Sequence, residues 1–453
     1  MRRHQLIALI LASALITLDG TAATIALPAI GRELSASMPR LQWIANAPLL
    51  ALAAMLLPAG TFGDRFGHVR LLRIGLMLFV AASAVCAAAS SNGAMIAARL
   101  GQGAGGALVL PAALAMLRAA HDDAAERTRI FGLWAAWTGV AGAVGPLVAG
   151  VLVDAWSWRA IFMMSAAIGV VAAVLLQREA GARAVIRDER VSGVATASLV
   201  VLLGALAYAL MRAARHGMSD PVLLVPCALA VAAGVTFVRD PRRQVLLPPE
   251  LLRARNCVAA NATDFALYFG MFGLSFVLSV YVQQVLHYSA MWAAIVLLPI
   301  SIMLLLAERF GRLTSSIGTK PLVIIGALTA AGGIAWIGTA PHPIPFWSHI
   351  IAGTTMFGLG MSVAVSALTH AAVAAVPADC AGAASGLNHA VVRAAGVMAV
   401  AALGSIATPG PSKVISTEGF HHAVLLCAAI VAVGGVAGAK LRDLEAGGVG
   451  AAS

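Results

Sequence analysis

The sequence predicts an all-α polytopic membrane protein, and two observations support this. Hydrophobic residues make up 60% of the 453 residues and charged residues only 11%, whereas soluble domains carry about 25% charged residues. The apolar residues also gather in continuous runs of about 20, the length that an α-helix needs to cross a bilayer. Membrane-spanning strands would instead alternate apolar and polar residues over about 10 positions.

Fourteen apolar segments are expected to span the membrane as helices, because a helix satisfies its own backbone polar groups in lipid. The first follows a basic start but is too long for the apolar region of a usual signal peptide, so we expect an uncleaved first span. In chain order the segments cover residues 6–28, 44–63, 71–90, 94–117, 130–153, 158–177, 193–211, 221–238, 257–284, 288–307, 321–339, 346–374, 385–407 and 420–438.

Basic residues are distributed unevenly between the two sides of these spans. If the N-terminus is cytoplasmic, 22 of the 30 Lys and Arg fall in cytoplasmic stretches and 6 in external ones. Cytoplasmic loops of membrane proteins carry this excess of positive charge. The sequence therefore predicts a multi-pass cell-membrane protein with both termini in the cytoplasm. Its basic residues then serve topology and contacts with membrane lipid, and no nucleic-acid partner is needed.

Two charged residues lie inside predicted spans of the first half. At about 1.5 Å per residue, Asp19 is about 20 Å and Arg99 about 27 Å from the cytoplasmic end of its helix. A charge at the bilayer centre costs about 2.5–3.5 kcal/mol on insertion scales, so it normally finds a partner or a watery cavity. A long Arg side chain covers the difference in depth, and we hypothesise an Asp19–Arg99 pair. The alternative is that Asp19 is a structural residue tying its helix to a neighbour.

Glycines mark three further stretches. The fifth span carries Gly139, Gly142, Gly145, Pro146 and Gly150, a pattern that predicts close helix packing and a bend. In the fourth span, GQGAGG at 101–106 matches GxGxxG but follows no strand, so it indicates helix packing and not dinucleotide binding.

The third stretch, GTFGDRFGHVR at 60–70, predicts a tight cytoplasmic loop in which glycines allow the turn. Its Asp64 would meet a helix N-terminus or an Arg across an interface and so latch one conformation. The alternative is a solvated hairpin. The residues that carry the pattern are Gly60, Asp64, Arg65, Gly67 and Arg70.

Together these stretches resemble the motif series of the major facilitator superfamily. TLDGTAATIALP at 17–28, GTFGDRFGHVR, RLGQGAGG at 99–106, GAVGPLVAG at 142–150 and WSWRAIF at 156–162 stand in the family's order. The fourteen spans are similar to its drug:proton antiporter branch, which often has a stretch like GAASGLNHAVVRAAG at 382–396.

The resemblance implies a major facilitator fold: a six-helix bundle at 1–192, two linker transmembrane helices with an inside loop at 193–256, and a second six-helix bundle with a short cytoplasmic tail at 257–453. It implies alternating access around a central cavity, driven by proton entry without a cofactor. It assigns Asp19 and Arg99 to proton coupling, the 60–70 stretch to conformational change, and the fifth-span motif to antiport. One departure is Ser165, which stands where asparagine is common.

The second half carries its own charges within spans. Asp264 and Arg393 lie about 10 and 13 Å from the cytoplasmic ends of their helices, so we expect them to pair. Asp264 is also a second candidate for a proton or cation site. The alternative is a polar residue at the cavity rim.

Aromatic side chains are candidates for stacking on a lipophilic or cationic substrate, although aromatics at membrane ends also serve as anchors. The substrate-cavity candidates are Trp43, Trp134, Trp137, Tyr268, Phe272 and Tyr281. The five cysteines are scattered without a CxxC pair, so we expect neither a disulfide framework nor a metal site.

The favoured function is a monomeric, proton-coupled antiporter that exports amphipathic or cationic drug-like compounds. The alternative is an exporter of a particular metabolite, lipid or self-made antibiotic that uses the same coupling. A third reading is a transporter-like sensor. HExxH, GxSxG and Walker A motifs do not occur, so we expect a secondary transporter and not an enzyme.

Overall fold

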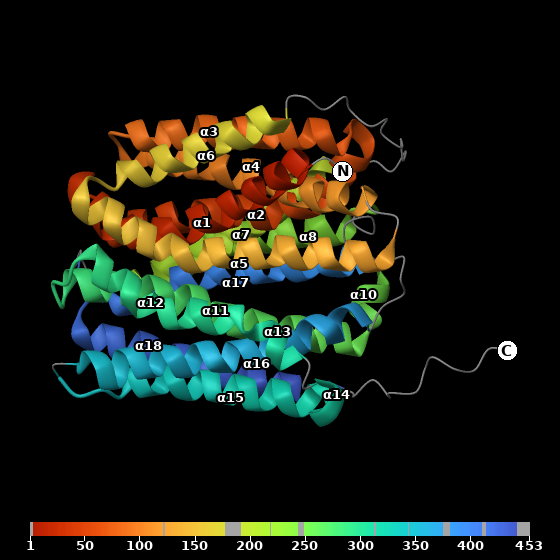
Figure 1. Ribbon diagram of the computed structural model, residues 1–453. Coiled ribbons are helices and arrows are strands. Elements are labelled where there is room, and N and C mark those ends of the chain that lie inside the picture. Colours follow the sequence, from red (N-terminus) through yellow and green to blue (C-terminus); the bar gives the residue numbers. More distant parts are fainter. Residues whose placement is uncertain are drawn as a thin grey trace.

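The computed structural model describes residues 3–120, 123–176, 192–217, 219–242, 249–311, 314–342, 344–374, 381–409 and 414–441. In these ranges the chain is helical, and its long helices run side by side (Figure 1). The start of α1 (Arg3–Glu33) and the end of α18 (Thr417–Gly438) lie at the same end of the molecule, which we call the terminal end. The opposite end, where α1 ends, is the far end.

The helices fall into two halves with a connecting hairpin between them. The first half holds α1, α2 (Met38–Phe66), α3 (His68–Ala88), α4 (Asn92–Ala119), α5 (Ala124–Ala155) and α6 (Arg159–Leu176). The hairpin holds α7 (Gly193–His216), the 3₁₀ turn η1 (Pro221–Leu223) and α8 (Leu224–Arg239). The second half holds α10 (Pro249–Arg253), α11 (Arg255–Gln284), α12 (Ala290–Leu305), α13 (Ala307–Gly311), α14 (Thr314–Ile317), α15 (Thr319–Gly338), the π-helix η2 (Phe346–Ile351), α16 (Ala352–Ala374), α17 (Ala381–Ala407) and α18.

The predicted count of fourteen spans is not confirmed. Among the described residues, 12 helices are long and apolar enough to cross a membrane. The two predicted spans outside this set are α2 and α12. α12 is apolar but has only 16 residues. α2 has 29 residues, and not all of its side chains belong to the described part of the chain.

The predicted loop at 60–70 is almost entirely helical, which corrects the sequence-based expectation. α2 continues to Phe66 and α3 starts at His68, so Gly67 alone separates the two helices. Gly67 has a φ of 89°, in the left-handed region that side chains other than glycine's disfavour. One glycine is therefore enough to reverse the chain, and the other glycines of the stretch remain inside the helix.

Close helix packing in the first half follows from the glycines of α4, as predicted. A Cβ on Gly103 would lie 2.6 Å from Cα of Pro48 in α2, and one on Gly105 would lie 2.8 Å from the backbone nitrogen of Phe79 in α3. These contacts leave no room for a side chain. Glycine thus lets α2 and α3 approach the α4 backbone directly.

The α7–α8 hairpin connects the halves in space as well as in sequence. Side chains of α7 share one buried apolar cluster with α2 of the first half and α17 of the second: Leu50, Ala53, Leu203, Ala207, Met211, Val397 and Ala401. α8 packs against α7.

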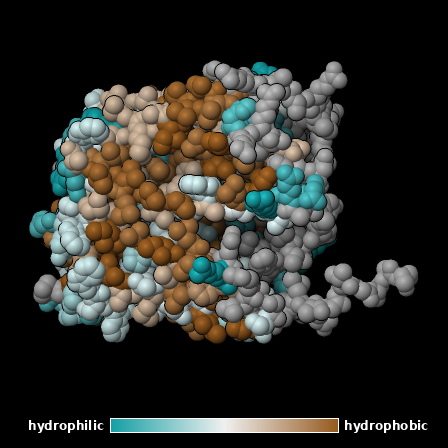
Figure 2. All heavy atoms as spheres, in the orientation of Figure 1, coloured by the Kyte–Doolittle hydropathy of each residue, from teal (hydrophilic) through white to brown (hydrophobic). Residues whose placement is uncertain are grey.

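The surface suits a lipid environment. A broad band of apolar side chains crosses the visible face, and hydrophilic residues gather at the far end (Figure 2). Large apolar residues on the outside of the bundle include Leu224, 72% exposed, and Val433, 69% exposed. Such exposure of apolar side chains on many helices is expected where lipid and not water surrounds the protein.

We predict that Gly103→Ala destabilises the protein by about 1–3 kcal/mol, because the new methyl group overpacks the α2–α4 contact. Gly93→Ala on the same helix is the matched control, since a Cβ there meets nothing within 4 Å. Thermal unfolding of both variants in detergent tests this. Equal melting temperatures for the two variants would show that the close α2–α4 approach is wrong.

Candidate functional site

Asp19 and Arg99 form a buried ion pair in the first half. Arg99 donates through Nη1 to Oδ2 of Asp19 at 2.6 Å, and the two side chains are 4% exposed or less. The structure thus forms the pair that depth in the membrane suggested. Arg99 also donates through Nε to the carbonyl of Ile44 at 3.4 Å and lies 5.7 Å from the ring of Phe162.

Neutral side chains complete the environment of the Asp19 carboxylate. Oδ1 accepts hydrogen bonds from Ser165 Oγ at 2.9 Å and from Gln102 Nε2 at 3.1 Å. Gln102 in turn accepts from Arg99 Nη1 at 2.8 Å and donates to Ser83 Oγ at 2.8 Å. The carboxylate therefore receives three donors from α4 and α6, one of them charged.

This arrangement gives a buried carboxylate a counter-charge and further hydrogen-bond donors. An isolated charge buried in an apolar environment is strongly unfavourable, but a paired and fully hydrogen-bonded one is tolerated. Protonation of Asp19 would remove the attraction to Arg99 and leave the guanidinium without its counter-charge. The contacts among α1, α4 and α6 therefore depend on the charge of this carboxylate.

The glycines of α5 lie between the two halves. A Cβ on Gly142 would lie 3.1 Å from Thr17 and one on Gly145 would lie 3.0 Å from the carbonyl of Leu18, both on α1. On the other side, Gly139 faces Leu305 and Gly150 faces Met291, both on α12. Pro146 is buried within this helix. At these four positions glycine thus lets α1 on one side and α12 on the other approach α5 closely.

Hydrogen bonds between described residues of the two halves all lie toward the far end. Gln42 donates to the carbonyls of Val400 and Ala401 and to Ser405 Oγ, and Asn46 donates to the carbonyl of Val397. Ser279 and Gln283 of α11 donate to the carbonyls of Thr24 and Ile25 in α1. α1 pairs with α11 and α2 with α17, so the far end is held closed.

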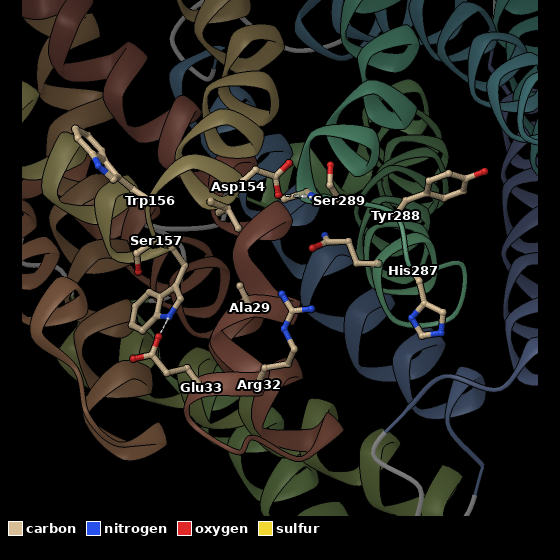
Figure 3. A pocket seen from close by; sticks show the side chains of 13 residues that line it. Ala29, Arg32, Glu33, Asp154, Trp156, Ser157, His287, Tyr288 and Ser289 are labelled. Carbon is tan, nitrogen blue, oxygen red and sulfur yellow. Dashed lines mark hydrogen bonds between the residues drawn. The ribbon is translucent and has the colours of Figure 1, made fainter.

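Asp154 closes the same end by capping a helix of the other half. Its carboxylate, at the end of α5, accepts from the backbone nitrogens of Ala290 at 3.0 Å and Met291 at 2.9 Å (Figure 3). Ser289 precedes α12 but makes no capping hydrogen bond of its own. The positive N-terminus of α12 therefore depends on a carboxylate from the first half.

A cavity of about 720 Å³ lies beside this cap (Figure 3). It is lined from α1, α5 and the α11–α12 connection, by residues that include Arg32, Glu33, Asp154, Gln283, His287 and Tyr288. Its two carboxylates already have partners: Glu33 accepts from Trp158 Nε1 at 2.6 Å and pairs with Arg159, and Asp154 caps α12. Neither carboxylate is therefore free to bind a cationic ligand without giving up a partner in the structure.

The expected pair of Asp264 and Arg393 is not formed among the described residues. Asp264 accepts through Oδ2 from Asn388 Nδ2 at 2.6 Å, and the Arg393 guanidinium lies 5.8 Å from the centre of the Phe272 ring. Asn388 precedes Arg393 by five residues on α17. The α17 side chain that is level with Asp264 is thus a neutral amide.

The conformational stretch is only partly described. Gly60 and Asp64 belong to α2, but their side-chain environments lie outside the described part. Gly67 forms the reversal, Arg65 is exposed with its guanidinium 5.2 Å from the Phe66 ring, and Arg70 is exposed. The suggested latch through Asp64 stays a prediction.

The aromatic candidates do not converge on one surface. Trp43 packs against the α2–α7–α17 cluster, Trp134 against the core of the first half, and Trp137 is 54% exposed. Tyr268 and Phe272 lie 6.4 Å apart on α11. Tyr281 is 1% exposed and stacks on Phe420 at 3.9 Å, so its ring is closed to a ligand in this conformation.

Sequence reasoning missed the neutral and boundary residues of these sites. Gln102 and Ser165 donate to Asp19, and Gln42 and Asn46 connect the two halves. All four side chains are neutral, so none stands out in the sequence as a charge that would be unfavourable in lipid. The available signal was helical spacing, because Gln102 follows Arg99 by three residues and shares its helix face. Asp154 directly follows a predicted span, and no local pattern around it indicates that it caps a helix of the other half.

Comparison with known proteins shows which family this chain belongs to. The family model described as Major Facilitator Superfamily matches residues 9–401. The methylenomycin A resistance protein of Bacillus subtilis is 32% identical over 372 residues, which cover 80% of this chain and 78% of that protein. The tetracenomycin C resistance and export protein of Streptomyces glaucescens is 31% identical over 399 residues, 86% of this chain and 73% of that protein.

Solved structures share the fold at low sequence identity. The inward-open xylose transporter XylE from E. coli aligns with a TM-score of 0.67 and 14% identity over 98% of this chain and 97% of its own. The peptide transporter POT in complex with sulfate aligns with a TM-score of 0.70 and 15% identity over 95% of this chain and 93% of its own.

We predict that Asp19→Asn and Arg99→Met are each destabilising by about 3–5 kcal/mol, because each leaves one buried charge unpaired. The double variant is expected to lose much less than the sum. Thermal unfolding of the four proteins in detergent provides the cycle. Additive losses would mean that the two residues act independently.

We predict that Asp154→Ala separates the halves at the far end, because the N-terminus of α12 loses its cap. Spin labels on Ser157→Cys and Tyr288→Cys, in a chain without other reactive cysteines, report the separation. We expect longer distances for Asp154→Ala than for Glu33→Ala, which removes a carboxylate paired only within the first half. Indistinguishable distance distributions would contradict this role.

Proposed function

This chain belongs to the major facilitator superfamily, and we propose that it exports amphipathic or cationic drug-like compounds in exchange for protons. Membership makes it a multi-pass membrane transporter and not an enzyme. The observation that supports the proposed coupling is the buried Asp19–Arg99 pair, set in a hydrogen-bonded network that joins α1 to α4 and α6.

Proton binding at Asp19 supplies the physical step of the proposed coupling. A neutral Asp19 no longer attracts Arg99, whose guanidinium then favours another partner or a route to water. Because α1 also packs against the glycines of α5, a change at Asp19 reaches the helix that contacts α12 of the other half. The energy comes from the proton gradient, and the mechanism requires no cofactor.

The cargo is inferred from relatives. The multidrug resistance protein Stp of Mycobacterium tuberculosis is 29% identical over 416 residues, 90% of this chain and 76% of that protein, and its name favours a broad drug range. The names of the methylenomycin A and tetracenomycin C proteins favour the second candidate, export of one particular antibiotic or metabolite. Both candidates use the same coupling.

The proposed arrangement in the membrane follows from charge. We place the terminal end in the cytoplasm, because the excess of Lys and Arg falls on that side. The closed far end then faces outward. We further propose that α2 and α12 cross the membrane beside the twelve apolar helices, giving fourteen spans, since α2 packs along α4 and α17 and α12 along α5 and α16. The protein acts as a monomer.

We predict that Asp19→Asn abolishes proton-driven export. Purified protein is reconstituted in liposomes with a pH dye inside and an imposed proton gradient. A panel of lipophilic cations and neutral lipophiles is then added. Wild type is expected to dissipate the gradient only when substrate is present, and Asp19→Asn is expected to lose this at least tenfold.

Ser157→Ala is the matched control, because it changes a residue of the far-end cavity away from Asp19. It is expected to keep wild-type flux. Wild-type flux in Asp19→Asn would remove Asp19 from the coupling. Flux with a single compound of the panel would favour the narrow exporter over the broad one.

A further inference from the structure

A second buried carboxyl group lies in the other half of the molecule. Asp264 is 2% exposed and sits nine residues into α11, about 14 Å from the terminal end of that helix. Its Oδ2 accepts one hydrogen bond, from the amide of Asn388 on α17. Its Oδ1 is buried and has no hydrogen-bond partner.

Asp264 and Asp19 therefore differ in the ion pairs and hydrogen bonds that compensate their charge. Asp19 receives a guanidinium and two further donors, whereas Asp264 receives one neutral amide and no ion pair among the described residues. A buried carboxylate without a counter-charge is far more costly than a neutral carboxyl group. A charge on Asp19 is therefore compensated in this conformation, whereas a charge on Asp264 is not compensated by the described residues.

We propose that Asp264 is a second proton-binding site, which holds its proton on Oδ1 in the conformation described while Asp19 is ionised. The ligand is a proton taken from water, and the site is built by Asp264, Asn388 and Asn261. Asn261 shares the same amide, since its Oδ1 lies 3.4 Å from Asn388 Nδ2. The transport role of this proton rests on the proposed function, but its binding does not.

No described group around the site supplies a counter-charge to Asp264 in this conformation, so we expect its charged state in a different one. The described titratable side chains that interact electrostatically within this cluster are Tyr268 on α11 and His389 and Arg393 on α17. Arg393 is the one permanent cation among them. It lies over Phe272 and pairs with no described carboxylate, so deprotonated Asp264 would gain this counter-charge only if the Arg393 guanidinium left the Phe272 ring, by a side-chain change or by movement of α17 against α11.

Such a movement reaches the interface between the halves. α17 is the helix that Gln42 and Asn46 of α2 bind at the far end. Release of the proton from Asp264 would therefore strain the hydrogen bonds from Gln42 and Asn46 to α17, which hold the far end closed. Two carboxyl groups, one in each half, then have opposite protonation states in one conformation.

Infrared difference spectroscopy tests the site without any substrate. Full-length protein in liposomes is stepped between acidic and alkaline buffer, and the carbonyl stretch of protonated carboxyl groups is recorded. We expect one band that is present in wild type and Asp19→Asn and lost in Asp264→Asn. In Asn388→Ala, which keeps the carboxyl group but removes its donor, we expect the band to persist to higher pH.

Three results would overturn the inference: an unchanged band in Asp264→Asn, an unchanged titration in Asn388→Ala, or loss of the band on adding sodium at constant pH, which would indicate a metal-cation site. The liposome flux assay is separate. A band assigned to Asp264 in protein without substrate-driven flux would refute the proposed antiport while leaving the proton site intact. Substrate-driven flux in protein that lacks the Asp264 band would refute the proton site and leave the proposed antiport intact.

Discussion

The structure depends on a carboxylate that lipid cannot accommodate alone. Asp19 lies in an apolar helix, and burial of its charge is tolerated only because Arg99, Gln102 and Ser165 converge on it from α4 and α6. These bonds fix three helices of the first half in one arrangement. In the proposed mechanism the arrangement is conditional, because a proton on Asp19 would remove the charge that attracts Arg99. A single chemical event is thus connected to the packing of half of the molecule.

The path from Asp19 to the other half is short. Thr17, Leu18 and Thr21 flank Asp19 on α1 and contact Gly142 and Gly145 of α5, and the opposite side of α5 packs on α12 through Gly139 and Gly150. Glycines at these positions bring α5 close to both neighbours, so a displacement of α1 is transmitted to α5 and α12 through direct contacts. The polar contacts that resist such a shift are concentrated at the far end, where Asp154 caps α12. The inferred proton on Asp264 would also affect this interface, because α17 carries both the partner of Asp264 and the far-end contacts to α2.

The role of a charged residue within an apolar run could be predicted from the sequence, whereas the role of a neutral polar residue there could not. The Asp19–Arg99 pair followed from depth, since few alternatives exist for a charge in lipid. The same argument paired Asp264 with Arg393, but in the structure the neutral amide of Asn388 donates to one oxygen of Asp264 and Arg393 lies over Phe272. The long apolar runs predicted an all-helical membrane protein correctly. They did not predict the helical stretch at 60–70, where glycines suggested a loop and Gly67 alone makes the turn. Asp154 acts through the backbone of a helix that is distant in sequence, and a local pattern cannot show this.

Proton release on substrate binding tests the central claim most directly. Purified protein in weakly buffered detergent solution is mixed with a lipophilic cation such as tetraphenylphosphonium, and the pH of the solution is followed alongside binding. If substrate and proton compete through Asp19, wild type releases protons as it binds the cation, and Asp19→Asn binds the cation without releasing them at that site. Equal proton release from wild type and Asp19→Asn, at equal occupancy, would contradict the account.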